Sequence, residues 1–177
     1  MGTASGKVGL VVFRGVRGKL IAANRPPITR SGPGTADQAV VKNRFKRAAR
    51  FATAALADKI LGPMYAARVG GNLYTPRLVA MSDYLNAPVI ENIDVSKYKG
   101  VIGNIIAIQA DDDFKVTRVS VTVLSGGAEI ETGDAVENTL QLSWIYTATA
   151  AATPGGITLQ ISAYDNAGNV TTQEKSV

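Results

Sequence analysis

Residues 88–177 carry the pattern that most constrains the fold of this chain. From Pro88 onward, β-branched residues and period-two alternation replace an alanine-rich stretch, as in VSVTV at 119–123 and ITLQISA at 157–163. Glycine, proline and asparagine clusters separate the alternating runs. We therefore predict seven short strands: 89–94, 101–111, 115–124, 128–132, 140–147, 156–164 and 170–175. That density of strands predicts an immunoglobulin-like β-sandwich, with Trp144 in its core between Leu142 and Tyr146.

Residues 1–87 predict a separate α+β domain, so the chain as a whole is expected to have two domains. Two β-rich runs, 8–14 and 19–23, predict a hairpin, and three prolines make 24–35 an extended arm. An isolated hairpin is only marginally stable, so it needs a helix or another copy of the chain as partner. The side chains expected to make that contact in an assembly are Val11, Phe13, Leu20 and Ile21.

A long basic helix is predicted to begin at Thr35 or Asp37 and to run to about Leu61, before Gly62 and Pro63. Shorter helices are predicted at 64–69 and 76–85. The apolar face of the long helix is expected to contain Val41, Phe45, Ala48, Ala52, Ala55 and Ile60. The candidates for contact with a polyanion or another partner are Lys42, Arg44, Lys46, Arg47 and Arg50.

The charge of the chain is divided sharply between its two halves. Residues 1–90 hold 14 lysines and arginines and 3 acidic residues, a net charge of +11. Residues 91–177 hold 5 lysines and arginines and 11 acidic residues, a net charge of −6. A polyanion partner for the front half would explain the division. Contact between oppositely charged halves of neighbouring subunits would also explain it, and so would a basic face exposed to solvent.

The absence of cysteine and histidine excludes thiolate nucleophiles, histidine bases and the usual zinc sites. Glu129 and Glu131 stand at alternate positions of one predicted strand, on one face, where acid/base chemistry is conceivable. Charge on the solvent face of an edge strand explains the pair better, because it discourages pairing between edges. We therefore expect a protein that is not an enzyme.

Clustered aspartates offer the one candidate for a cofactor. Asp111 and Asp113, with Asp165 at the same end of the predicted sandwich, could bind Ca²⁺ through carboxylate oxygens. Aspartate is also a frequent turn former, and we favour that simpler explanation. No other cofactor or metal is expected.

The sequence resembles known proteins in both halves. ADDDF at 110–114, VSVTV at 119–123, WIYT at 144–147 and AYDNAGNV at 163–170 resemble the bacterial immunoglobulin-like and fibronectin-III-like repeats of surface and adhesion proteins. That resemblance implies a fold, together with binding or spacing as the function. The front half, with GKVG at 6–9 followed by Thr35, Gln38, Arg44, Phe45 and Phe51, resembles a family of small uncharacterised bacterial proteins without established activity.

Three functions remain open at this level. The first is a structural subunit that self-associates through its N-terminal domain into an oligomer, filament or shell, or decorates one. The second is a nucleic-acid-binding module that uses the basic helix, and the third is an adhesin or carbohydrate-binding module. The interrupted apolar run at 8–13 does not form a signal peptide, and no run is long enough to span a membrane. A cytoplasmic or particle-associated location is therefore expected over direct secretion.

Overall fold

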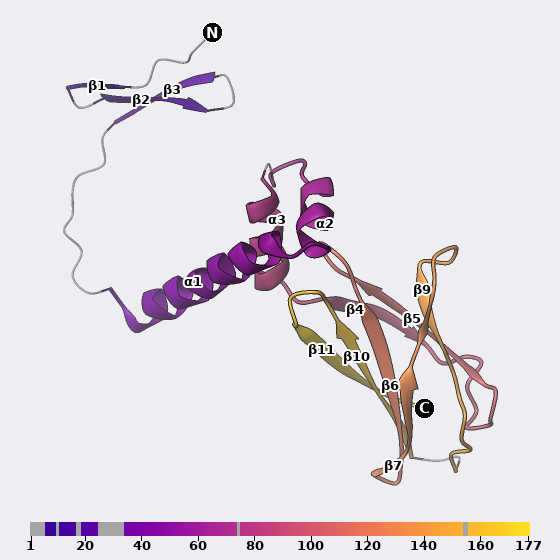
Figure 1. The fold of residues 1–177 in the computed structure, drawn as a ribbon. Coiled ribbons are helices and arrows are strands. Elements are labelled where there is room, and N and C mark those ends of the chain that lie inside the picture. The colour runs from indigo at the N-terminus through magenta and orange to yellow at the C-terminus, as the bar shows by residue number, and fades with distance from the viewer. Residues whose placement is uncertain (1–5, 10, 17–18, 25–33, 74, 154–155) are drawn as a thin grey trace. The chain divides into compact units, whose positions relative to one another are not determined.

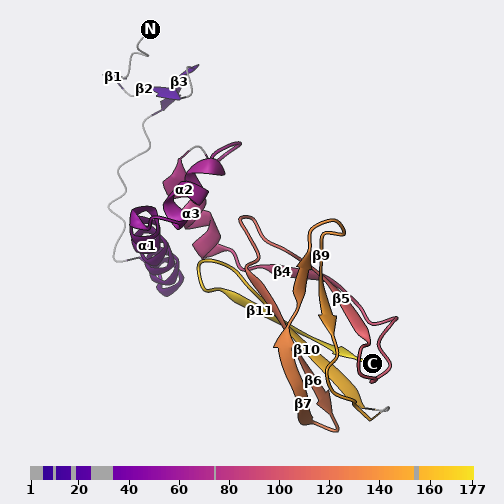
Figure 2. The same cartoon turned by 45° about the vertical axis from the view of Figure 1, so that its right-hand side comes forward.

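The structure is a computed structural model that describes residues 6–9, 11–16, 19–24, 34–73, 75–153 and 156–177. In these residues the chain forms three helices and eleven strands, and the strands are arranged in three antiparallel sheets (Figures 1 and 2). The chain separates into two compact units, Met1–Ala39 and Val40–Val177. Each unit is described by itself below.

The first unit contains a three-stranded sheet of order β1-β2-β3, formed by β1 (Gly6–Val8), β2 (Val11–Val16) and β3 (Lys19–Asn24). The predicted first run therefore divides into two strands, which pair next to the turn at Gly9, where φ is +58°. Glycine reaches this conformation without a steric penalty. Gly15 lies within β2 rather than in the predicted turn. The prolines of the predicted arm lie outside the described residues.

Helix α1 (Ala36–Ala57) begins with a reciprocal cap. The backbone N–H of Gln38 donates to Thr35 Oγ1 over 3.2 Å, and the N–H of Thr35 donates to Gln38 Oε1 over 3.3 Å. This capping box confirms the predicted start. The helix ends four residues before the predicted Leu61, because Asp58 Oδ1 accepts the N–H groups of Ile60 and Leu61 at 2.8 Å and turns the chain.

The second unit continues with α2 (Leu61–Ala67) and α3 (Pro76–Leu85). Helix α3 has the predicted bounds, with Thr75 as its N-cap and proline in its first turn. Arg77, at the start of α3, donates to Thr53 Oγ1 and to the carbonyl of Ala49 on α1. The small buried core between the helices contains Ala52, Ala55, Tyr65, Val79, Ala80 and Phe114.

Two four-stranded antiparallel sheets complete this unit, as Figures 1 and 2 show. The first has the order β4-β5-β9-β8, and the second has the order β11-β10-β6-β7. The strands are β4 (Val89–Asp94), β5 (Ile105–Asp111), β6 (Arg118–Ser125), β7 (Ala128–Asp134), β8 (Val136–Asn138), β9 (Ser143–Thr147), β10 (Ile157–Tyr164) and β11 (Val170–Ser176).

One apolar core lies between these two sheets. Val121 of β6 pairs with Ile161 of β10, and Ile106 and Ile108 of β5 lie in the same buried cluster. All four side chains are fully buried. The alternating pattern of burial along β6 and β10 confirms the period-two alternation read from the sequence. Trp144 belongs to this core, as predicted.

The strand bounds depart from the prediction in several places, and β6 begins at Arg118 rather than at residue 115. Residues 101–104 form a turn in which Asn104 Oδ1 accepts the backbone N–H of Lys99, so β5 begins at Ile105. Leu142 is exposed, with φ at +49°, so β9 begins at Ser143 and Leu142 does not join Trp144 in the core. The three-residue strand β8 has too short a pattern to be recognised in the sequence.

The boundary predicted between residues 87 and 88 is not where the units separate. The division falls after Ala39, inside the first turn of α1. The helical core includes Phe114, which lies in the loop between β5 and β6. The helices therefore share a buried core with the sheet region, and the change in sequence texture at Pro88 marks a change of secondary structure within one unit.

Candidate functional site

The sheet of the first unit has one face made of apolar side chains. Val8 pairs with Val11, Phe13 pairs with Ala22, and Leu20 lies two residues before Ala22 on the same strand. Directly paired residues share a face, as do residues two apart, so these five side chains form one surface, here called the apolar sheet face. Val11 and Phe13 are half-buried and the other three are exposed.

The opposite face of the same sheet carries cations alongside the apolar side chains of Val12, Ile21 and Ala23. Ile21 pairs with Arg14, and Lys7 pairs with Val12. Lys19 lies two residues before Ile21 and therefore shares its face. The four predicted contact residues are thus divided. Val11, Phe13 and Leu20 lie on the apolar sheet face, whereas Ile21 lies among the cations on the other side.

The N-terminal half of α1 is uncovered as well. Along the described part of the chain, the first buried residue is Ala48. Val41 and Phe45 stand on the predicted apolar face of the helix, yet their exposed fractions are 54% and 52%. The prediction of a core-facing stripe is confirmed for Ala48, Ala52 and Ala55 and wrong for Val41, Phe45 and Ile60.

All five predicted partner-contact residues on α1 are exposed: Lys42, Arg44, Lys46, Arg47 and Arg50. Arg44 donates a hydrogen bond to the carbonyl of Leu85, the last residue of α3. That bond satisfies a carbonyl at the end of a helix and gives Arg44 a role within the fold. The other four residues form no ion pair with the described part of the chain.

A second cluster of polar residues joins α3 to the loops of the sheet region. The side-chain nitrogen of Asn169, in the β10–β11 turn, lies 3.0 Å from the carbonyl oxygens of Asp83 and Asn86 and 2.6 Å from Asp165 Oδ2. Ser82 Oγ donates to Asp113 Oδ2 over 2.6 Å. These contacts attach the end of α3 to two loops of the sheet region.

Asp83 is the buried centre of that cluster. Its side chain is fully buried, and its Oδ2 accepts the hydroxyl of Tyr65 over 2.5 Å. The pKa of Asp83 is raised to about 7, mainly by burial and also by the negative charges of Asp165, Asp112 and Asp113, whereas the Tyr65 hydrogen bond lowers it. Burial, together with the same hydrogen bond, raises the pKa of Tyr65.

The structure gathers a different set of carboxylates from the set predicted for Ca²⁺. Oxygen atoms of Asp83, Asp112 and Asp113 lie within 4.8 Å of one another. Of the three residues predicted to bind Ca²⁺, only Asp113 belongs to this group. Asp111 is exposed and does not belong to it. Both carboxylate oxygens of Asp165 accept hydrogen bonds from Asn169. Asp83 was missed, although a lone aspartate in a largely apolar helix is a signal that the sequence carries.

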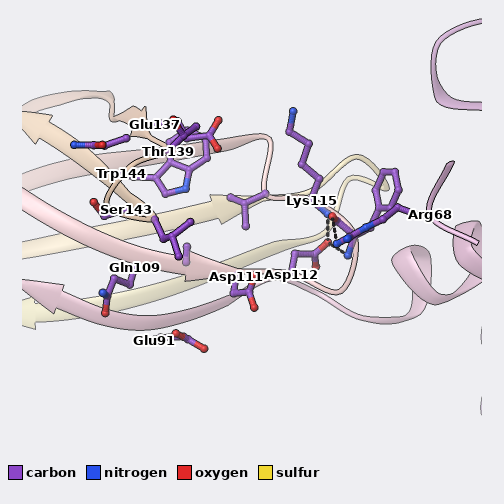
Figure 3. A pocket seen from close by; sticks show the side chains of 15 residues that line it. Arg68, Glu91, Gln109, Asp111, Asp112, Lys115, Glu137, Thr139, Ser143 and Trp144 are labelled. Carbon is purple, nitrogen blue, oxygen red and sulfur yellow. Dashed lines mark hydrogen bonds between the residues drawn. The ribbon is translucent and has the colours of Figure 1, made fainter. Parts of the chain in front are cut away.

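A cavity of about 450 Å³ opens on the same side of the sheet region (Figure 3). Arg68 and Lys115 lie at one end of it, whereas Trp144 and Glu137 lie near the other. Arg68 donates to the carbonyl of Phe114 over 3.3 Å. The lining mixes cations, carboxylates and amides, which suits a polar ligand, and the described lining contains no paired nucleophile and base.

The expectation that Glu129 and Glu131 share one solvent face is wrong. Glu129 pairs with Leu124 and Glu131 pairs with Val123, so Ile130 is an extra residue in a β-bulge. The bulge turns Glu131 into the interior while Glu129 stays exposed. Glu131 Oε2 accepts hydrogen bonds from the backbone and hydroxyl of Thr149, at 2.7 and 2.5 Å, and from the backbone of Ala150 at 3.0 Å.

The comparisons with known proteins found no counterpart. The sequence matches no family model, and searches of curated proteins and of solved structures gave no match. Among the described residues, no helix is long and apolar enough to cross a membrane.

Proposed function

We propose that this chain is a structural subunit without enzymatic activity that self-associates through its N-terminal region and displays an immunoglobulin-like domain. The observation that carries the proposal is the uncovered apolar surface at the front of the chain. From Gly6 to Arg47, the structure describes no buried side chain. A second copy of the chain is the proposed cover for the apolar sheet face.

The physical argument begins with the stability of the small sheet. A sheet of three strands becomes stable when its apolar face is packed against something. Leu20 has an exposed fraction of 58%, and full burial of such a side chain is worth about 1.5–3 kcal/mol. Strand β3 also pairs with β2 alone among the described strands, so its other edge can pair with a strand of another copy.

The division of charge supports association between copies. Residues 1–90 carry a net charge of +11 and residues 91–177 carry −6, so the front of one subunit attracts the back of another. The face of the sheet that carries Lys7, Arg14 and Lys19 contributes to the positive front. Contacts of this head-to-tail kind form closed rings or open filaments.

The order of strands supports an immunoglobulin-like domain at the back. Labelled A to G along the chain, with β7 as C′, the strands form one sheet of order A-B-E-D and a second sheet of order G-F-C-C′. Immunoglobulin-like sandwiches divide their strands between two sheets in this way. Such domains serve binding or spacing roles in many proteins, so the fold itself leaves the ligand open.

The proposal is tested with a matched pair of substitutions on one strand. Leu20 and Ile21 are neighbours with similar exposure, 58% and 48%, on opposite faces of the sheet. We expect Leu20→Glu to weaken self-association by at least about tenfold, because a charge cannot be buried in an apolar contact. Ile21→Glu places the charge among cations and is expected to preserve assembly. The measurement is light scattering with negative-stain microscopy on nuclease-treated protein.

Two results would contradict this proposal. One is a wild-type chain that remains an 18.5 kDa monomer at every concentration tested. The other is an equal loss of assembly in both variants, which would mean that the apolar sheet face is not the contact.

Nucleic-acid binding by the basic helix is the second candidate, and the exposure of Lys42, Lys46, Arg47 and Arg50 favours it. Such contact with phosphates is strongly weakened by salt. The same scattering experiment separates the two functions. Particles held together by nucleic acid disappear on nuclease treatment, whereas particles held by the apolar sheet face remain.

A further inference from the structure

The acidic cluster at the junction of α3 and the sheet region contains two buried oxygen atoms for which the described residues supply no donor. Asp83 is fully buried, and while its Oδ2 accepts the Tyr65 hydroxyl, its Oδ1 has no hydrogen-bond partner in the part of the chain that the structure describes. Asp112 Oδ2 accepts the backbone N–H groups of Phe114 and Lys115, at 3.0 and 2.8 Å, and its Oδ1 is buried without a partner too. A buried oxygen left without a donor destabilises the folded state.

Among the described residues, no basic side chain forms an ion pair with these carboxylates. In the part of the chain that the structure describes, no lysine or arginine nitrogen lies within 4.0 Å of Asp83, Asp112, Asp113 or Asp165. The nearest candidate by sequence, Lys115, contributes its backbone N–H to Asp112. Buried charge of one sign is costly unless a proton or a cation compensates it.

We propose that Asp83, Asp112 and Asp113 bind a single Ca²⁺ ion at this junction. Their ligand oxygens lie within 4.8 Å of one another, which is close enough for one ion to contact all three. Ca²⁺ takes about 6–8 oxygen ligands in flexible geometry, so carboxylates and water together can complete its shell. Asp113 is exposed, and it gives the ion and its water a route from solvent.

The proposed ion has a structural consequence. Asp83 belongs to α3, whereas Asp112 and Asp113 follow β5, so one ion connects the helical part of the unit to the sheet region. It complements the polar contacts that Ser82 and Asn169 already make across the same junction. A ligand that binds only the folded state stabilises that state, and the stabilisation grows with the logarithm of the ligand concentration.

The test is calcium titration of the full chain after chelator treatment, followed by calorimetry and by thermal unfolding. Wild type is expected to bind one Ca²⁺ per chain and to unfold at a higher temperature with added CaCl₂. Asp83→Asn keeps an oxygen that can accept the Tyr65 hydroxyl and removes the charge. We expect this substitution to weaken calcium binding by at least about tenfold, the scale on which altered metal sites lose affinity.

Asp111→Asn is the matched control, because Asp111 is exposed, lies next to Asp112 and carries the same charge. It is expected to change calcium affinity by no more than about twofold, the scale of a weak surface interaction. The inference is overturned if wild type shows no binding heat and no thermal shift with CaCl₂. It is also overturned if Asp111→Asn loses as much affinity as Asp83→Asn, which would indicate diffuse attraction to acidic charge. Circular dichroism establishes that each variant is folded before titration.

Discussion

In strand β7, the extra residue Ile130 places the glutamates on either side of it in different environments. Glu129 is exposed, whereas Glu131 is buried and accepts three hydrogen bonds from Thr149 and Ala150. Burial raises the pKa of Glu131, but the hydrogen bonds from Thr149 and Ala150 outweigh it, so the pKa lies below its ordinary value of 4.5. The ionised form of Glu131 is therefore part of the stable fold.

The first prediction at this scale concerns Glu131→Gln. Hydrogen bonds to a charged group are worth about 1.5–3 kcal/mol, so we expect the variant to lose stability of that order at pH 7. A carboxylate whose pKa is lowered by folding stabilises the folded state at every pH above its pKa in the unfolded chain. That contribution disappears as the pH falls through its pKa in the folded protein. The difference between wild type and Glu131→Gln should therefore shrink below pH 4.5.

Urea unfolding at neutral and acidic pH measures that difference. Glu129→Gln serves as the control, because Glu129 is exposed on the same strand. Surface substitutions of this kind usually stay within about 0.5 kcal/mol. A stability difference for Glu131→Gln that does not change with pH would contradict an ionised Glu131 in the folded protein.

At the scale of elements, a loop of the sheet region supplies a hydrogen-bond donor to the C-terminal end of helix α3. The Asn169 side chain lies within hydrogen-bonding distance of the carbonyls of Asp83 and Asn86, near the end of α3. Carbonyls in the last turn of a helix have no partner within the helix, and a side chain from elsewhere can satisfy them. The β10–β11 turn thus fixes the position of α3.

We expect Asn169→Ala to destabilise the second unit by about 1–3 kcal/mol, because the carbonyl of buried Asp83 and Oδ2 of buried Asp165 lose this donor. Urea unfolding followed by tryptophan fluorescence measures the loss, since Trp144 lies in the core between the two sheets. Asn92→Ala is the control, because Asn92 is exposed on β4 and makes no side-chain hydrogen bond to the described residues. Equal stability of the two variants would mean that Asn169 does not hold α3.

At the scale of the whole molecule, the buried cores and the proposed assembly surface belong to different units. Both buried clusters lie within residues 40–177. The apolar sheet face lies within residues 1–39. The division suggests that folding of the second unit does not require the first unit.

A chain without residues 1–34 tests that division. It retains Thr35 as the cap of α1, so the helix keeps its start. We expect it to unfold at the same temperature as the second unit of the full chain and to stay monomeric in light scattering. Assembly of the shortened chain into the particles that the full chain forms would remove the basis for the proposed function.

The sequence predicted those elements whose pattern is local. Alternation in 119–123 and 157–163 identified two central strands, and Thr35 and Pro76 marked the starts of α1 and α3. The predicted end of the long helix at Gly62 and Pro63 is wrong, because both residues lie inside α2. The sequence did not predict the bulge at Ile130, because an extra residue in one strand is defined by its pairing with the partner strand, which the local sequence does not contain. Nor did it predict that Asp83 meets Asp112, because that contact depends on how α3 packs against a distant loop. The exposure of Val41 and Phe45 depends on tertiary partners that periodicity does not contain.

The bulge in β7 also bears on how this chain can vary over generations. Substitution at Glu129 or Glu131 changes one side chain in a fixed environment. Deletion of Ile130 would make the two glutamates consecutive residues, which point to opposite faces of a regular strand, so Glu131 could still face Thr149 while Glu129 faced solvent. The inward position of Glu131 therefore does not require the extra residue, and we expect homologues to vary at positions 129 and 130 more freely than at position 131.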